Sequence, residues 1–277
     1  MPELPEVQTT VKGLQVLIHN QISNVKINST KIRYDIPKDI KKILKNNKFI
    51  RIYRIGKYIL FDLNNNYSLI IHLGMSGRLQ IIRSANLSKK KHNHIILSIK
   101  NKKLLFNDPR KFGFVDIRKT KEIHNIKYIK VLGIDALDKK INTAYIKNKI
   151  GKSVVPIKQI LLNQRIISGI GNIYASEILY DAKISPFVSG FKLNDEEIAR
   201  IIKSIRKILI KAINAGGSTL RDYSSSDGTL GNFQKYFKVY GKEGCKVSGK
   251  EIKRIIQYGR STFFCPEVQF KKNKKKL

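Results

Sequence analysis

FIRIYRIGKYILFDL, residues 49–63, is the stretch that decides the fold of the first half of this chain. Two runs rich in isoleucine, leucine, tyrosine and phenylalanine flank Gly56, which is typical of a β-hairpin. Similar runs follow at residues 67–82 and 94–106, with turn signals at 74–77 and 101–102. The repeated pattern predicts an antiparallel β-sandwich or barrel.

Helical patterns lie on both sides of this β-rich region. Val7, Val11, Leu14 and Ile18 recur at helical spacing and predict an amphipathic helix near the N-terminus. From about Asn142 the sequence becomes helical, most clearly from residue 194, where an isoleucine stripe runs to a stop at Gly216. The last 35 or so residues return to short strand-like pieces. We therefore expect an α+β multidomain protein, with a sandwich flanked by helices.

The first six residues, MPELPE, suggest covalent chemistry. Removal of Met1 would leave Pro2 with a secondary amine, and an α-amino group titrates at about 7.7 to 8.0, well below a lysine side chain. Such an amine can form a Schiff base with a sugar aldehyde. Glu3 could act as general acid or base, and Glu6, in the first turn of the helix, could position its neighbours. The alternative is a solvated tail before a helix.

The charge of the chain indicates a polyanionic partner. The 277 residues include 55 Lys and Arg against 20 Asp and Glu, a net charge of +35. Nucleic acid is the leading candidate because phosphate neutralisation releases counterions. An anionic membrane surface is the weaker alternative, since the sequence contains no apolar run of about 18 residues and no secretory signal pattern.

Several short segments in the same order resemble the bacterial formamidopyrimidine-DNA glycosylase (Fpg) family. They are PELPE at 2–6, GKY at 56–58, HLGMSG at 72–77, NDPRKFG at 107–113, GIGNIYA at 169–175 and a finger from about 236 to 269. The resemblance implies a catalytic β-sandwich domain at 1–135 and a helix-two-turn-helix domain at 136–235. A β-hairpin finger at 236–270 and a basic tail at 271–277 would follow.

The resemblance implies a bifunctional DNA glycosylase and AP lyase with four catalytic residues. Pro2 would be the nucleophile and Glu3 its proton-transfer partner, with Glu6 behind them. Lys57 would contact phosphates around the lesion, although an ordinary exposed lysine is the alternative from sequence alone. Arg260, at the tip of the finger, would hold phosphates and assist δ-elimination.

Further residues would bind DNA. Met75, Arg110 and Phe112 lie in turns and would fill the space left by a flipped base, although core packing is the alternative for the two apolar residues. Asn172 would cap a helix whose free amides bind phosphate, or would simply cap it. Three more positions resemble DNA-contacting positions of the family: His92, Lys152 and Lys158. The segment from 215 to 228 resembles the loop that closes over the oxidised base, with a surface linker as the alternative.

The finger departs from the family pattern of four cysteines that bind zinc. The four positions read Cys245, Ser248, Cys265 and Val268, so two thiolate ligands are missing. We expect a zincless finger with two reduced thiols, and no cofactor for catalysis.

The sequence therefore predicts a DNA repair enzyme that removes oxidised purines, such as 8-oxoguanine and formamidopyrimidines, from double-stranded DNA. We expect a monomer in the bacterial cytosol or nucleoid, without a membrane partner. One alternative is an endonuclease VIII-like enzyme for pyrimidine lesions, although Leu4 and the PRKFG loop at 109–113 favour the purine enzyme. The other is a non-catalytic protein that binds damaged DNA.

Overall fold

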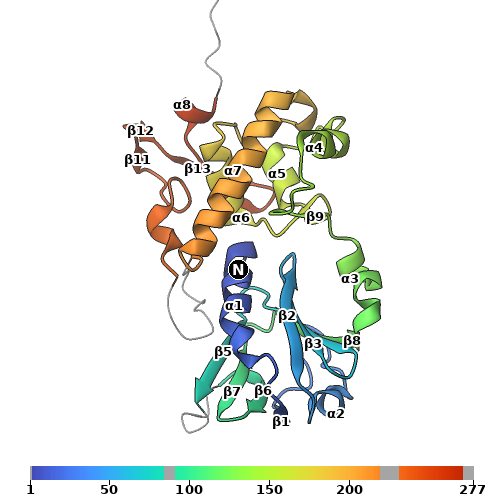
Figure 1. The fold of residues 1–277 in the computed structure, drawn as a ribbon. Helices are drawn as coiled ribbons and strands as arrows, with labels where there is room; N and C mark the ends of the chain where they lie inside the picture. The colour runs from blue at the N-terminus through green and yellow to red at the C-terminus, as the bar shows by residue number, and fades with distance from the viewer. Residues whose placement is uncertain (1, 84–90, 219–230, 271–277) are drawn as a thin grey trace, which may run out of the picture. The chain divides into compact units, whose positions relative to one another are not determined.

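The computed structural model describes residues 2–83, 91–218 and 231–270 (Figure 1). The chain forms two compact units. The first unit combines Met1–Val131 with Ala212–Gln234, and the second combines Leu132–Lys211 with Lys235–Leu277. Each unit is therefore built from two separate stretches of sequence.

The first unit is a β-sandwich of two four-stranded antiparallel sheets, as predicted. One sheet has the order β1-β6-β7-β5, and the other has the order β2-β3-β4-β8. The strands of the first sheet are β1 (Ile22–Ile27), β6 (Asn93–Ile99), β7 (Lys102–Asn107) and β5 (Arg78–Arg83). Those of the second are β2 (Phe49–Ile55), β3 (Tyr58–Leu63), β4 (Tyr67–His72) and β8 (Phe114–Lys119).

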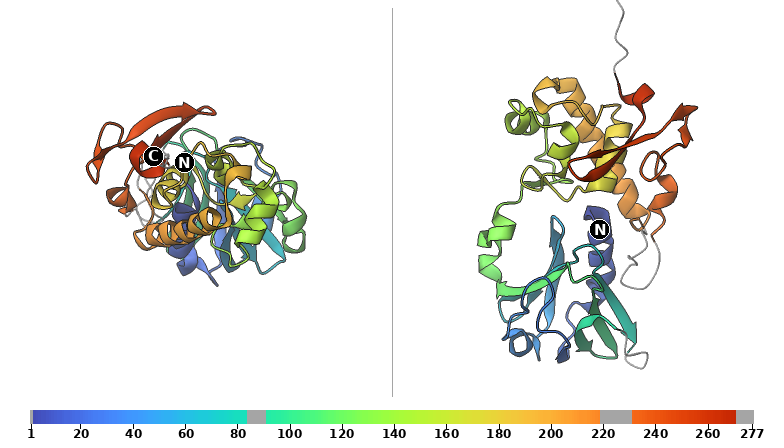
Figure 2. Two further views of the ribbon diagram at one scale, coloured as in Figure 1. Left: turned by 90° about the horizontal axis from the view of Figure 1, so that it is seen from above. Right: turned by 180° about the vertical axis from the view of Figure 1, so that it is seen from behind.

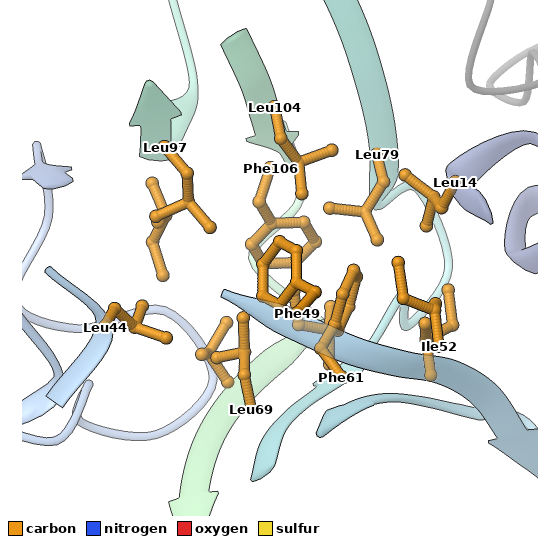
Figure 3. Packing of buried hydrophobic residues seen from close by; sticks show 14 of the residues in the cluster. Leu14, Leu44, Phe49, Ile52, Phe61, Leu69, Leu79, Leu97, Leu104 and Phe106 are labelled. Atoms are coloured by element: carbon orange, nitrogen blue, oxygen red, sulfur yellow. The ribbon is translucent and has the colours of Figure 1, made fainter. Parts of the chain in front are cut away.

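The core of this unit lies between the two sheets (Figure 3). Side chains alternate along each strand, so Phe61 of β3 and Phe106 of β7 both point inward and are 0% and 1% exposed. Burial of each such side chain contributes roughly 1.5 to 3 kcal/mol. Helix α1 (Leu4–Leu14) adds its apolar face, including Leu14, to the same core and packs against β2. The core therefore holds the first turn of α1, which follows Pro2, in a fixed place.

The second sheet also has a covered outer face. Leu60 and Ile70 pack there against Ile123 of the 3₁₀ helix η3 (Thr120–Asn125). Short helices complete the unit: η1 (Gln15–Leu17), α2 (Ile40–Leu44) and α3 (Lys127–Lys130). The predicted N-terminal helix is shorter than expected, because α1 ends at Leu14 and the chain tightens into η1 before Ile18.

The second unit is helical, with short strands at two places. Its helices are α4 (Thr143–Ile150), α5 (Ile157–Leu162), α6 (Asn172–Asp181), η4 (Gly190–Lys192) and most of α7 (Asp195–Asn214). Strands β9 (Ile134–Asp135) and β10 (Ile167–Ser168) pair in parallel. Asn194 and Glu197 form reciprocal side-chain hydrogen bonds at the start of α7, and its buried stripe includes Ile205 and Leu209. The long helix that the sequence predicts from residue 194 is thus α7.

The finger belongs to the same unit. It follows η5 (Phe233–Tyr236) and contains β11 (Lys246–Val247) paired with β12 (Lys250–Glu251), and β13 (Lys253–Gln257) paired with β14 (Arg260–Phe264). The short helix α8 (Pro266–Gln269) ends the described chain. Strand β14 packs against α6, as the view from behind shows (Figure 2). Within the described residues, no helix has the length and apolar character needed to cross a membrane.

Candidate active site

The N-terminal turn places three of the predicted site residues together. Glu3 is the N-cap of α1, and Pro5 occupies the first turn, where a missing N–H costs no hydrogen bond. The backbone N–H of Glu3 donates to Glu6 Oε2 at 2.9 Å. Pro2, Glu3 and Glu6 are all buried, which does not fit a solvated tail. Met1 lies outside the described residues.

The carboxylate of Glu6 also binds a residue that is distant in the sequence. Its Oε1 accepts hydrogen bonds from the backbone N–H of Ser218 at 2.7 Å and from Ser218 Oγ at 2.9 Å. Gly217, with a φ of +78°, comes so close that a Cβ there would lie 3.1 Å from Glu6 Oε1. Glycine is required here both for the backbone conformation and for the close approach.

Ser218 lies in the segment 215–228 that resembles the base-covering loop and is the last described residue before position 219. Ser218 pairs with Asn232 in an isolated β-bridge, and the N–H of Phe233 donates to the carbonyl of Gly217 at 3.0 Å. The described residues on either side of positions 219–230 are thereby joined to each other, and Ser218 is also joined to Glu6. Residues 219–230, which include most of the predicted loop, lie outside the described residues.

Lys57 follows the Gly56 turn between β2 and β3, as predicted, but its side chain is only 7% exposed. It is therefore not an ordinary surface lysine. His72, which ends β4, pairs with Tyr58, the residue that follows Lys57. Burial, followed by the charges of Lys57 and Arg33, lowers the pKa of His72 to about 4.

His72 is a site feature that the sequence reasoning did not assign. Its ring packs against Tyr58 at 4.9 Å and Phe114 at 5.6 Å between centroids. Its Nδ1 accepts a hydrogen bond from the backbone N–H of Gly74 at 3.1 Å, which is consistent with a neutral ring. The motif HLGMSG contains the signal that could have indicated it, because a histidine two residues before a glycine turn can hold that turn.

Two turns of the first unit carry the predicted base-displacing residues. Met75 is 39% exposed and Phe112 is 41% exposed, so core packing does not explain either side chain. The guanidinium of Arg110 lies over the ring of Phe112 at 5.0 Å. These exposed side chains suit insertion between bases.

The two turns are joined by a buried hydrogen-bond network. Ser76 Oγ donates to Asp108 Oδ1 at 2.6 Å, and Asp108 Oδ2 accepts from the N–H of Gly113 at 2.7 Å. The N–H of Arg110 donates to Ser76 Oγ at 3.2 Å. Gly74 touches the other turn so closely that a Cβ on it would lie 2.3 Å from the carbonyl carbon of Phe112.

His92 belongs to the same cluster. It is exposed, has a φ of +73°, and its carbonyl accepts a hydrogen bond from the N–H of Asp108 at 3.1 Å. The first unit thus groups Met75, His92, Arg110 and Phe112 around one buried carboxylate.

The predicted site residues of the second unit lie just after α4, on α5, on α6 and on the finger. Gly171 is the N-cap of α6 and Asn172 is its first residue, so the predicted capping role of Asn172 is wrong by one position. The side-chain amide N–H of Asn172 donates to the carbonyl of Ser261 at 3.0 Å, so this side chain contacts the finger. Lys152 is exposed just after α4, as a phosphate-binding lysine would be.

Lys158 requires a correction. Its side chain is 0% exposed, and its Nζ donates to the carbonyl of Ser261 at 2.9 Å and to Thr262 Oγ1 at 2.7 Å. Direct contact with DNA does not fit this buried position. Arg260, one residue before Ser261, is exposed at the start of β14, directly after the turn at Tyr258 and Gly259.

The finger does not fit a conventional zinc site. Cys265 is buried and Cys245 is exposed, both as free thiols, while Ser248 and Val268 stand at the other two positions. Among residues 2–83, 91–218 and 231–270, no three His, Cys, Asp or Glu side chains gather as a metal site would need. Structural zinc takes four such ligands.

Buried polar groups hold the finger instead. The carboxylate of Glu177 accepts hydrogen bonds from three consecutive backbone N–H groups, those of Lys238, Val239 and Tyr240, at 2.8 to 3.0 Å. Burial raises the pKa of Glu177, and these three donors oppose the rise. Gln269 accepts from the N–H of Cys265 at 2.7 Å and donates to the carbonyl of Ile184 at 2.9 Å.

Comparison with known proteins decides the family. Residues 1–115 match the family model "Formamidopyrimidine-DNA glycosylase N-terminal domain", and residues 132–224 match "Formamidopyrimidine-DNA glycosylase H2TH domain". The chain belongs to the formamidopyrimidine-DNA glycosylase family. The helix-two-turn-helix domain expected from the sequence is therefore present, and its match spans residues 132–224.

Relatives cover the whole length of the chain. The formamidopyrimidine-DNA glycosylase of Rickettsia africae is 42% identical over 274 residues, 98% of this chain and 100% of that protein. That of Zymomonas mobilis is 43% identical and covers 97% of this chain and 100% of its own length.

Solved Fpg structures agree with the fold. Lactococcus lactis Fpg in complex with DNA containing an abasic site has a TM-score of 0.89 and is 34% identical, covering 97% of this chain and 100% of that chain. The wild-type Lactococcus lactis Fpg with N7-benzyl-Fapy-dG DNA has a TM-score of 0.90 and is 33% identical. The match covers 98% of this chain and 100% of that chain.

Proposed function

We propose that this chain is a base-excision-repair DNA glycosylase that removes oxidised purines from duplex DNA and then cleaves the strand as an AP lyase. The observation that carries the proposal is the buried N-terminal turn, in which Pro2 directly precedes α1, with Glu3 as its N-cap and Glu6 hydrogen-bonded to Glu3. Family membership and the DNA complexes of its relatives support the substrate class.

The reaction begins with the amine that Met1 removal exposes on Pro2. Its nitrogen attacks C1′ of the flipped nucleoside, and the bond from C1′ to the damaged base breaks, so that the base leaves with the bonding electron pair and takes up a proton. Glu3 protonates the ring oxygen as the sugar opens, and an iminium links Pro2 to C1′.

Strand cleavage follows from the acidity that the iminium gives to C2′–H. Loss of that proton breaks the C3′–O bond and releases the 3′ phosphate, and a second elimination releases the 5′ phosphate. Lys57 and Arg260 hold phosphates of the damaged strand, and Arg260 assists the second elimination. A lysine or arginine suits this role because each offers a positive charge on a long stem.

The exposed turns supply the flipping step. Met75 and Phe112 enter the stack where the damaged nucleotide leaves, and Arg110 hydrogen-bonds the orphaned base. The phosphate backbone of the DNA is contacted by His92, Lys152 and Asn172. We also propose that the protein is a monomer and that it acts on DNA in the bacterial cytosol or nucleoid.

The finger works without zinc in this proposal. Glu177, Gln269 and Lys158 provide buried hydrogen bonds at the positions where it meets the helices. Cys245 and Cys265 remain reduced thiols, and no cofactor takes part in catalysis.

Two other functions are weaker. An endonuclease VIII-like enzyme is not favoured because both family matches and the full-length relatives are those of the purine enzyme. A non-catalytic damage-binding protein would not need the arrangement of Pro2, Glu3 and Glu6 at the start of α1.

Borohydride trapping on a duplex with 8-oxoguanine opposite cytosine tests the proposal. Protein with a Pro2 terminus, verified by mass spectrometry, is expected to form a covalent adduct with the DNA. Acetylation of the terminus should abolish the adduct, and Pro2→Gly should reduce it only in part, because glycine retains an amine. Tight binding without any adduct would support the non-catalytic protein instead.

A further inference from the structure

Lys158 is an unusual residue because its ammonium group is buried within the second unit. Lysine is almost never fully buried unless its charge is bound by other groups, since the loss of hydration is costly. Here the side chain is 0% exposed on α5, and its Nζ lies 2.9 Å from the carbonyl oxygen of Ser261 and 2.7 Å from Thr262 Oγ1. Both acceptors belong to strand β14 of the finger.

The acceptors are held from a second helix as well. The side-chain amide of Asn172, at the start of α6, donates to the same Ser261 carbonyl at 3.0 Å. Thr262 Oγ1 donates to Gln257 Oε1 at 3.1 Å, and Gln257 Nε2 donates to the carbonyl of Pro186 at 3.3 Å. The hairpin of β13 and β14 is thus fastened at its tip end by a continuous polar network.

The fastened residues adjoin Arg260. Arg260 pairs with Gln257 across the turn formed by Tyr258 and Gly259, whose φ angles are 50° and 70°. The direction in which its exposed side chain leaves the hairpin therefore depends on the placement of Ser261 and Gln257. A hydrogen bond from a charged donor is stronger than one from a neutral donor, so the two bonds of Lys158 are stronger than the neutral bonds of this network.

We infer that Lys158 is a positioning residue that fixes the finger hairpin so that Arg260 meets the DNA phosphate in the geometry needed for strand cleavage. The inference rests on the proposed function for its catalytic consequence. It replaces a direct role of Lys158 in DNA binding, because a phosphate cannot reach an ammonium group that is fully covered. In a finger with two of the four family cysteines, this network supplies an attachment that needs no metal.

A double-mutant cycle between Lys158 and Arg260 tests the inference. Lys158→Met removes the ammonium group and keeps the length of the side chain, and Lys203→Met, at an exposed position of α7, is the matched control. The measurements are the single-turnover rate of the second elimination and the slope of DNA affinity against salt concentration. Coupled residues give non-additive effects in such a cycle.

We expect Lys158→Met to slow the second elimination by about tenfold or more, because it removes both charged hydrogen bonds to β14, with much less change in the amount of DNA bound. In the Arg260→Ala background the same change should have no further effect. Lys203→Met should leave the rate unchanged. Additive losses in the double variant would overturn the inference. A salt slope that falls by about one in the Arg260→Ala background would also overturn it, because it would show that Lys158 itself neutralises a phosphate.

Two further measurements keep the inference separate from folding and from the proposed function. Thr262→Val removes one acceptor at nearly constant volume, and it should give a smaller loss of the same kind if Lys158→Met does not fold. Hydrogen exchange of the free protein should show faster exchange of the amides of 253–264 in Lys158→Met. If the wild type forms no borohydride adduct, the proposed function fails. If the exchange of these amides is unchanged in Lys158→Met, the inference that Lys158 holds the β13–β14 hairpin fails.

Discussion

Ser76 and Asp108 connect the two turns that carry the proposed base-displacing side chains, with 2.6 Å between Ser76 Oγ and Asp108 Oδ1. Asp108 is 0% exposed, and its other oxygen binds the N–H of Gly113. Met75 lies in one turn, and Arg110 and Phe112 lie in the other. The three exposed side chains therefore share one buried support.

Ser76→Ala should separate base flipping from strand cleavage. The substitution removes the only hydroxyl that the described network offers to Asp108 Oδ1, and a lost hydrogen bond to a buried charge costs about 1.5 to 3 kcal/mol. We expect excision of 8-oxoguanine to slow about tenfold or more. Cleavage of DNA with a preformed abasic site should slow much less, because that site is easier to unstack. Equal losses on the two substrates, measured in single-turnover assays, would contradict this role.

Ser218→Ala should weaken the attachment of the base-covering loop to the N-terminal turn. It removes the hydrogen bond of Ser218 Oγ to Glu6 and keeps the one from the backbone, so we expect a loss of about 1 kcal/mol in the free energy of unfolding. Denaturant unfolding gives this value. Ser23→Ala, at an exposed serine on β1 whose Oγ donates to the carbonyl of Ser98 at 3.2 Å, is the control for an exposed hydrogen bond and should stay within about 0.5 kcal/mol of the wild type. A similar change in both variants would show that the contact with Glu6 contributes little.

The low pKa of His72 should make the free energy of unfolding fall in acid. Unfolded histidine titrates near 6.5, and the folded pKa of His72 is about 4. Between these pH values the unfolded chain binds a proton that the folded chain does not, so stability is full above pH 6.5 and falls as the pH decreases toward 4. The loss from this group is at most roughly 3 kcal/mol. Unfolding followed from pH 7 to pH 4 should show a flatter profile in His72→Gln, and an equally steep profile would exclude His72 as the cause.

Removal of metal should leave the protein unchanged. Two of the four finger positions are Ser248 and Val268, so a chelator is expected to alter neither the melting temperature nor the strand-cleavage rate. Metal analysis of the purified protein should give far less than one zinc per chain. The double variant S248C/V268C restores the four-cysteine pattern and is expected to bind about one zinc and to become sensitive to the chelator. Inactivation of the wild type by a chelator would refute a zincless finger.

The sequence predicts the regular elements well because their physical signals are local. The alternation along residues 49–63 follows from the two faces of a strand, and the stripe of α7 follows from the helical repeat. Exposed turn residues such as Met75 could be expected from their glycine neighbours. The first turn of α1 also lies where the sequence places it.

Contacts between distant segments could not be predicted in this way. Glu6 and Ser218 are 212 residues apart, and periodicity shows which face of an element is buried but not which segment covers it. For this reason the packing of Ala212–Gln234 with the first unit was not expected.

Lys158 shows a second limit. A lysine on a short helix is usually a solvated charge, so its sequence context gave no sign that the ammonium group is covered by β14. The structure also places the helix N-cap at Gly171 and not at Asn172, whose side-chain amide donates to the carbonyl of Ser261. Lys158 and Asn172 thus both contact the same finger strand, β14.

The close approach of Gly74 to Phe112 limits how this enzyme can be redesigned. A Cβ at position 74 would lie 2.3 Å from the carbonyl carbon of Phe112 and 2.4 Å from the nitrogen of Gly113, so any residue other than glycine would force the backbone of one turn to move. A library that varies residues 74–77 against a fixed partner loop would consist largely of misfolded members. A redesign that aims at a different opposite-base preference must therefore replace the turns at 74–77 and 109–113 together.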